Sequence, residues 1–295
     1  MTEQLFKACS KGDLLEATRL SVLRSVDINW QNCRGETALH IASRYGHLEI
    51  VKILLSRPNV GVNTCSKEGN TPFAEACAQG KLEVVKLLMD DPRVHVNKPE
   101  NGGCTPFMHA CNSHSKNLDD ENHLGVIKLL LQNPKIEINK AQKDEVTPFY
   151  LACERNLLAL ADLLLARKDT DVNRPKKESS PFYIACEKGH ADLVQKLVGN
   201  KKIDISQMKK GTTPLLIAAI RRHEEVVKLI LSSKREEDSR IADAARLARN
   251  YSANNPIPSI LHILNSYLDK PAETLCRMRY SLSKTSPSGL VWLGS

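Results

Sequence analysis

Cysteine and histidine are the side chains of this sequence with the widest chemical range, because a thiolate can act as a nucleophile and both residues bind metal ions. Five of the nine cysteines, however, share one position of a recurring segment: Cys9, Cys77, Cys111, Cys153 and Cys186. A catalytic nucleophile has no reason to recur five times in one chain, whereas a small core residue does, and free cysteine is among the most buried residue types. We therefore predict that these side chains lie in the hydrophobic core.

Histidine recurs in the same way. His47, His190 and His223 share one position at the start of an apolar helical stripe, which favours a structural role for them, as for His40.

The nearest approach to a metal-ligand set is Cys111, His114 and His123, whose spacing matches no zinc pattern. The sequence also contains no Gly-x-Ser-x-Gly elbow, phosphate-binding glycine loop, His-Glu-x-x-His pair or kinase signature. We expect no enzyme activity, no metal, no cofactor and no small-molecule substrate.

Composition indicates a protein from inside the cell. The chain has 295 residues and a formal charge of +8, its cysteines form no Cys-x-x-Cys pair, and no apolar run approaches the length of a membrane span. The N-terminus also lacks the regions of a signal peptide. We expect reduced thiols, no membrane insertion and a cytoplasmic location, with the nucleus also allowed.

The recurring segment opens with Thr or Ser, and successive copies are separated by 34, 34, 42, 33 and 33 residues. A polar residue that closes triplets such as Asp-Ile-Asn keeps the same register. The first of these, Asn29, implies an earlier, degenerate copy that opens at Glu3. The copies therefore begin near residues 3, 37, 71, 105, 147, 180 and 213 and occupy residues 1–235.

Each position of the segment has a physical role. Thr or Ser followed by Pro is typical of a helix start, because the hydroxyl caps free N–H groups and Pro tolerates the first turn. A short helix, a reversing glycine and a second helix with an apolar stripe follow, as in residues 48–55. Helix pairs this short bury their apolar faces only by stacking on one another. Eight extra residues within 112–122 explain the long step, and their polarity indicates a surface loop.

The segment Gly35–Leu55, "GETALHIASRYGHLEIVKILL", resembles the ankyrin repeat. The resemblance implies an all-α repeat solenoid of about seven helix-turn-helix units linked by β-hairpin-like fingers. It also implies a non-catalytic scaffold or adaptor that binds a protein partner on a concave face. In that family the variable contact positions lie four, three and one residues before the Thr position and seven and eight after it.

Those positions make up the predicted protein-binding set: Arg34, Glu36, Arg44, Tyr45, Lys67, Glu68, Asn70, Gln79, Asn101, Lys143, Asp144, Glu154, Arg155, Lys176, Lys177, Glu187, Lys188, Lys209, Lys210 and Arg221. Repeat six carries three Lys and one Glu, a sum of +2, and repeat seven carries two Lys and one Arg, a sum of +3. This basic end predicts an acidic segment in the partner, since complementary charge speeds and orients association. A solvated rim that binds nothing is an equally good interpretation. Few aromatic residues lie among these positions to stack bases, so nucleic acid is disfavoured.

The C-terminal part departs from the repeat. Residues 240–270 predict a helix pair that caps the stack, and residues 271–295 predict a basic helix with a flexible tail. Leu275, Cys276 and Arg277 resemble the core of a SOCS box, which gives the alternative of a substrate-recognition adaptor for a ubiquitin ligase. Ala272 stands where that box has Leu, and no Leu-Pro-x-Pro follows.

One modification is also implied by resemblance. Leu165 and the triplet Asp171 to Asn173 are similar to substrates of an asparaginyl hydroxylase that acts on ankyrin repeats, and Asn173 is the residue such an enzyme would modify.

Overall fold

The computed structural model describes residues 1–112, 121–233, 235, 238–252 and 258–285, and within them every regular element longer than an isolated bridge is helical. The chain divides into two compact units, Met1–Pro148 and Phe149–Ser295. Unit 1 contains helices α1 (Thr2–Lys11), α2 (Leu14–Ser21), α3 (Ala38–Tyr45), α4 (Leu48–Leu55), α5 (Pro72–Ala78), α6 (Leu82–Asp90), α7 (Pro106–Cys111) and α8 (Glu121–Gln132). The predicted all-helical class is confirmed.

Unit 2 starts within α9 (Pro148–Arg155) and continues with five more helices that belong to repeats, followed by three that do not. The repeat helices are α10 (Leu158–Ala166), α11 (Pro181–Lys188), α12 (Ala191–Gly199), α13 (Pro214–Ile220) and α14 (Glu224–Ser232). The last three helices of the described chain are α15 (Asp238–Ser252), α16 (Pro258–Asp269) and α17 (Pro271–Thr285).

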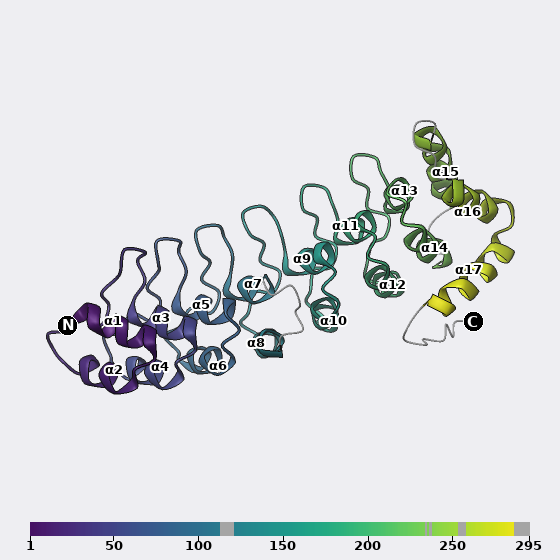
Figure 1. Cartoon of the computed structure of the whole chain (residues 1–295). Coiled ribbons are helices and arrows are strands. Elements are labelled where there is room, and N and C mark those ends of the chain that lie inside the picture. The colour runs from purple at the N-terminus through teal and green to yellow at the C-terminus, as the bar shows by residue number, and fades with distance from the viewer. Residues whose placement is uncertain (113–120, 234, 236–237, 253–257, 286–295) are drawn as a thin grey trace. The chain divides into compact units, whose positions relative to one another are not determined.

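Within each unit the helices form two rows (Figure 1). In unit 1, α1, α3, α5 and α7 contact one another in sequence, and α2, α4, α6 and α8 form the second row. In unit 2, α11 contacts α13 and α10 contacts α12, which in turn contacts α14. The segments that precede the first-row helices project together on one side of each unit as fingers.

The first-row helices begin where the Thr-Pro pattern predicts. The hydroxyl oxygens of Thr71, Thr105, Ser180 and Thr213 each accept a hydrogen bond from the backbone N–H three residues later, and a proline follows each of them. The first-row helices α3 and α11 end at a left-handed glycine, Gly46 at φ 80° and Gly189 at φ 76°. The tight reversal leads directly into the second helix, so each repeat is a compact helix pair.

The core is a stack of equivalent side chains. Phe73, Phe107, Phe149 and Phe182 are each 1% exposed, and an alanine and a cysteine follow at equivalent positions of the same helices. The five cysteines of the recurring position are all 0% or 1% exposed, which confirms that they are core residues. Burial raises the pKa of the Cys9 thiol to about 12, far from the range of a reactive thiolate.

The polar residue that closes each triplet joins neighbouring repeats. The Asn63 amide, for example, donates to the Arg93 carbonyl at 2.6 Å and accepts from the His95 N–H at 2.8 Å. Equivalent paired bonds are made by Asn29, Asn97 and Asn173. These residues recur because each one satisfies two backbone groups of the next turn.

The fingers of unit 1 share one turn. Asn32 N–H donates to Glu36 O, Gly35 N–H donates to Asn32 O, and Gly35 has a φ of 75°. This is the pattern of a three-residue hairpin loop that ends in a left-handed residue. The same left-handed position is held by Gly69, Gly103 and Glu145, at φ values of 93°, 84° and 68°.

The two fingers that precede α11 and α13 are one residue shorter and turn differently. Lys176 and Ser179 exchange both backbone hydrogen bonds at 2.9 Å, and Lys177 and Glu178 between them have φ values of 45° and 69°. Positive φ at both central residues is the signature of a type I′ turn. The turn between Lys209 and Thr212 is built likewise. The change of turn explains the shortening of the step from 34 to 33 residues.

Three helices follow the last repeat. Helix α15 contacts α13 and α16, and α17 contacts α14 and α16. Leu275, Met278 and Leu282 of α17 are buried at 7%, 4% and 6% exposure, while Cys276 is exposed. The apolar side of α17 therefore packs within unit 2. The domain limits proposed at residues 235 and 271 remain predictions, and most of the loop at 112–122 and the tail beyond 285 lie outside the described residues.

The type I′ turns allow a test of backbone strain. Gly211 occupies the left-handed second position of the Lys209–Thr212 turn at φ 75°, and no atom lies within 4 Å of the Cβ it would gain. Gly211→Ala should therefore lower the free energy of unfolding through backbone strain alone, by about 1 kcal/mol. The matched change Glu178→Gly relieves strain in the preceding turn and should raise the free energy of unfolding by about 0.5 kcal/mol.

Urea unfolding followed by circular dichroism measures both effects. If Gly211→Ala were neutral, or Glu178→Gly destabilising, the two turns would not carry the strain that their φ values indicate.

Candidate functional site

The candidate site is the inner face, which we define as the surface formed by the fingers and the first-row helices of each unit. Eighteen of the twenty residues of the predicted binding set come from these two elements, and Gln79 and Arg221 directly follow a first-row helix.

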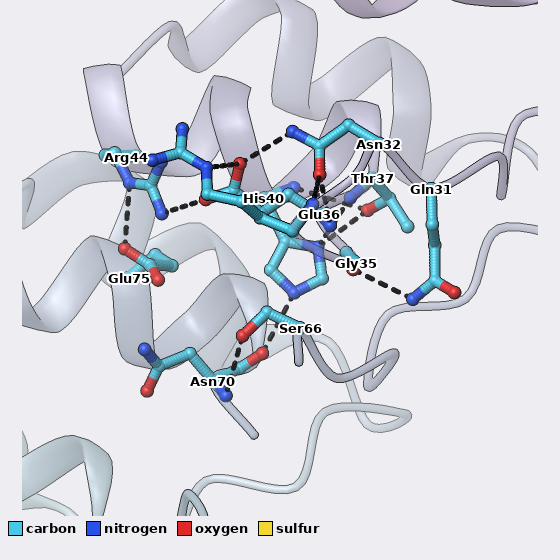
Figure 2. Close-up of polar contacts among 11 residues, drawn as sticks. Gln31, Asn32, Gly35, Glu36, Thr37, His40, Arg44, Ser66, Asn70 and Glu75 are labelled. Atoms are coloured by element: carbon cyan, nitrogen blue, oxygen red, sulfur yellow. Dashed lines mark hydrogen bonds and ion pairs between the residues drawn. The ribbon is translucent and has the colours of Figure 1, made fainter. Parts of the chain in front are cut away.

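Four charged side chains, those of Arg34, Glu36, Arg44 and Glu75, form a network on the inner face of unit 1 (Figure 2). The Glu36 carboxylate is 3% exposed and accepts hydrogen bonds from Asn32 Nδ2 at 2.8 Å and from Arg44 Nη2. Arg44 also donates from Nε to the Glu75 carboxylate at 3.0 Å. Burial alone would raise the pKa of Glu36, but the bonds from Asn32 and Arg44 hold it below the ordinary value. Arg44 is thus fixed between a finger and the next first-row helix.

His40 lies behind this network and is fully buried. Its Nε2 lies 2.9 Å from the Asn70 carbonyl, which can only accept, and its Nδ1 accepts from the Thr37 N–H at 3.1 Å. Both contacts suit the neutral ring, and a proton on Nδ1 would face the Thr37 N–H. Burial, partly offset by the bond to Asn70, lowers the pKa of His40. His40 is structural, as predicted.

A pocket of about 460 Å³ opens beside the network in unit 1. Its lining includes Arg44 and Glu75 from the network and three more residues of the predicted set, Glu68, Asn70 and Gln79. His109, Asn112 and His123 of the next repeat supply the rest of the polar wall. The pocket is therefore lined by donors and acceptors rather than by apolar surface.

The inner face of unit 2 is basic and is built around two tyrosines. Lys176 Nζ lies 5.6 Å from the centre of the Tyr150 ring, and Lys209 Nζ lies 5.4 Å from that of Tyr183. In each case a finger lysine lies over the aromatic residue at the third position of the preceding first-row helix. Cation–π contacts of this length hold the ammonium group in place while leaving it polar.

Glu187 bridges two repeats of unit 2. Its carboxylate lies 3.2 Å from Arg221 Nη2 and 3.8 Å from Lys209 Nζ. Both belong to a pocket of about 650 Å³ whose charged lining is Glu154, Lys176, Lys177, Glu187, Lys188, Lys209, Lys210 and Arg221. Six cations against two carboxylates leave a formal surplus of four positive charges.

Most other members of the predicted set are solvent-exposed. Tyr45 is 51% exposed, and Arg34, Lys67, Asn101, Lys143, Asp144 and Arg155 are also exposed. Glu36 is the exception, since its carboxylate is committed to Arg44. Its position, one residue before the capping residue, is also buried in other repeats, where it holds Cys104, Val146 and Ser179. The finger tips and helix ends, more than this position, therefore form the accessible surface.

A family model described as ankyrin repeats matches the chain in three copies, at residues 5–100, 58–142 and 149–243. These matches cover more than half of the sequence. The chain belongs to the ankyrin-repeat family. Ankyrin repeats suggest a protein–protein interaction scaffold and are in general non-catalytic. The number of about seven repeats remains an interpretation of the spacing and of the helix pairs.

The ankyrin framework accounts for the chemically versatile residues. In the part of the chain that the structure describes, no group of three or more His, Cys, Asp or Glu residues is placed to hold a metal ion. His114 lies outside the described residues. No described helix is long and apolar enough to cross a membrane.

One member of the recurring histidine position escaped the sequence analysis. His123 Nε2 donates to the Ala78 carbonyl at 3.2 Å, as His190 and His223 do to the equivalent carbonyls of Glu154 and Glu187. The extra residues before α8 hid this equivalence. Alignment of His123 with Lys81, from the apolar stripe that follows each, would have revealed it.

Asn173 has a structural function whatever its modification state. Its amide donates to the Lys202 carbonyl at 2.8 Å and accepts from the Asp204 N–H at 2.8 Å. Modification of Asn173 stays a prediction.

Neutral His40 should make the stability of the array depend on pH. The unfolded chain takes up a proton near the ordinary pKa of about 6.5, which the folded ring resists, so stability falls as the pH drops through that value. His40→Met, which copies Met108 of another repeat, should cost about 1 kcal/mol at neutral pH through loss of the capping bonds. The variant should then lose less stability than the wild type on acidification.

Urea midpoints at about pH 7 and about pH 5.5 test this, because carboxylates remain charged across that interval. Equal losses in the two proteins would show that His40 does not couple folding to protons.

Proposed function

We propose that the inner face of unit 2 binds an acidic segment of a protein partner. The observation that carries the proposal is the pocket lined by six cations and two carboxylates, in a family whose repeats form protein-interaction scaffolds. Of the two carboxylates, Glu187 is already engaged by Arg221 and Lys209. The exposed lysines of this pocket are Lys177, Lys188 and Lys210.

The arrangement of these lysines favours binding over a merely solvated rim. Lys176 and Lys209 are held over tyrosine rings, so part of the entropy of ordering them is lost before a partner arrives. Lys177 and Lys210 lie at the left-handed first position of their turns, at φ 45° and 50°. Such strained non-glycine positions are concentrated at functional sites, where surrounding structure maintains them.

Charge reversal tests the proposal. Lys177, Lys188 and Lys210 changed together to Glu should weaken the binding of a fluorescein-labelled peptide rich in Asp and Glu by more than about tenfold, because attraction becomes repulsion. Fluorescence anisotropy at increasing salt gives the affinity, which should fall with salt for the wild type but not for this variant.

The matched control reverses Lys168, Lys201 and Lys202, three exposed lysines of unit 2 outside the pocket. The two triple variants carry the same net charge. If the control loses as much affinity as the pocket variant, or if neither loses any, the peptide does not bind in this pocket and the proposal fails. Capture of partners from lysate with the three proteins would then identify which interactions depend on the pocket.

The alternative of a ubiquitin-ligase adaptor has weaker support. Of the residues that resemble a SOCS-box core, Leu275 is buried within unit 2 and Arg277 pairs with Glu273 of its own helix. A recruitment helix needs its apolar side free for the partner, whereas α17 uses this side for packing. Retention of the elongin pair by the chain would revive that alternative.

A further inference from the structure

The pocket of unit 1 contains buried polar atoms that are satisfied by no other described residue. Three side-chain atoms are buried and have no hydrogen-bond partner within the described chain: Asn70 Oδ1, His109 Nε2 and Asn112 Oδ1. All three residues line the same pocket of about 460 Å³. In Figure 2 the main chain of Asn70 bonds to Ser66 and His40, while its side-chain amide takes part in none of the contacts drawn. Leaving one such atom unsatisfied costs about 1–3 kcal/mol, so three around one pocket need an explanation.

The charges around this pocket are negative in sum. Among the lining residues, Glu68 and Glu75 carry two negative charges and Arg44 carries one positive charge, which leaves one negative charge in excess. Burial lowers the pKa of His109, an effect that Glu100 and Glu75 only partly oppose, so its ring is neutral at pH 7. The Nε2 atom of a neutral ring can accept a hydrogen bond, as both Asn oxygens do.

We propose that this pocket binds the guanidinium group of an arginine side chain from a protein partner. Its acceptors come from separate residues on two successive repeats, and a guanidinium supplies five N–H donors in one plane, whereas an ammonium supplies three on a single atom. The excess negative charge compensates the incoming cation. Neutral amides would satisfy the orphan atoms without using this charge.

The inference rests on the proposed protein-binding role of the inner face but concerns the other unit and the opposite charge. An arginine in a partner would enter unit 1, while acidic residues would bind in unit 2. The two proposals can therefore fail independently.

The test is an NMR titration of the isotope-labelled full chain with the blocked peptide acetyl-Gly-Arg-Gly-amide. The side-chain signals of Asn70, Asn112 and His109 should shift and saturate. The citrulline peptide, which has the same shape without the charge, should bind about tenfold more weakly, since charge-assisted hydrogen bonds are roughly twice as strong as neutral ones. The lysine peptide should fall between them.

Three variants make the assignment specific. Glu68→Gln should weaken binding of the arginine peptide several-fold, whereas Glu83→Gln, an exposed glutamate outside this pocket, should not. Asn70→Ala should also weaken binding, yet leave the urea midpoint unchanged or higher, because it removes a buried oxygen that has no partner.

Absence of shifts, or equal shifts with arginine and citrulline, would overturn the proposal and show that the pocket holds water alone. Loss of stability in Asn70→Ala would overturn it too, since the amide would then serve the fold. The triple reversal at Lys177, Lys188 and Lys210 should leave this titration unchanged, which separates its outcome from that of the acidic-peptide experiment.

Discussion

Burial between neighbouring repeats is the interaction on which this structure depends. The first-row helix α3 has eight residues and α7 has six, and isolated helices below about 12–15 residues are marginal in water. They persist because Phe, Ala and Cys side chains of one helix fill the space against the next. Truncating one such Phe to Ala would remove about 3–5 kcal/mol, a large share of the stability of any single interface. Stability is therefore a property of neighbours rather than of a repeat.

The polar side chains of the framework follow the same rule. Asn63 and His190, for example, satisfy backbone groups of an adjacent repeat rather than of their own. Because buried backbone groups must be paired, these bonds fix the spacing between repeats as firmly as the apolar contacts do. The inner-face positions are then free to carry charge, and the two units carry it with opposite sign around their pockets.

Much of the fold could be predicted from residue spacing. The capping Thr and Ser residues, the Phe and Cys positions and the all-helical class followed from helix capping and from helical periodicity, both of which are local. The candidate site was less predictable, because the side chains there depend on contacts across repeats. The burial of Glu36 requires Arg44 and Glu75 together, and the placement of Lys176 and Lys209 requires tyrosines some 26 residues earlier in the chain. The shortened step between repeats was visible in the sequence, but its cause, a different turn with two left-handed residues, was not.

Departures from local rules are concentrated on the inner face, and this distribution bears on function. A scaffold optimised for stability alone would place Gly or Asn at the positions of Lys177 and Glu178 and would pair or replace the side chains of Asn70 and Asn112. Each of these residues instead costs stability, and each lies on a finger or at the end of a first-row helix. The second-row helices α4 and α14, by contrast, carry ordinary i,i+3 and i,i+4 ion pairs, Lys52 with Glu49 and Lys228 with Glu224. Strain and unsatisfied polarity gathered on one face suit a binding site, since a group already satisfied within the fold has little to gain from a partner.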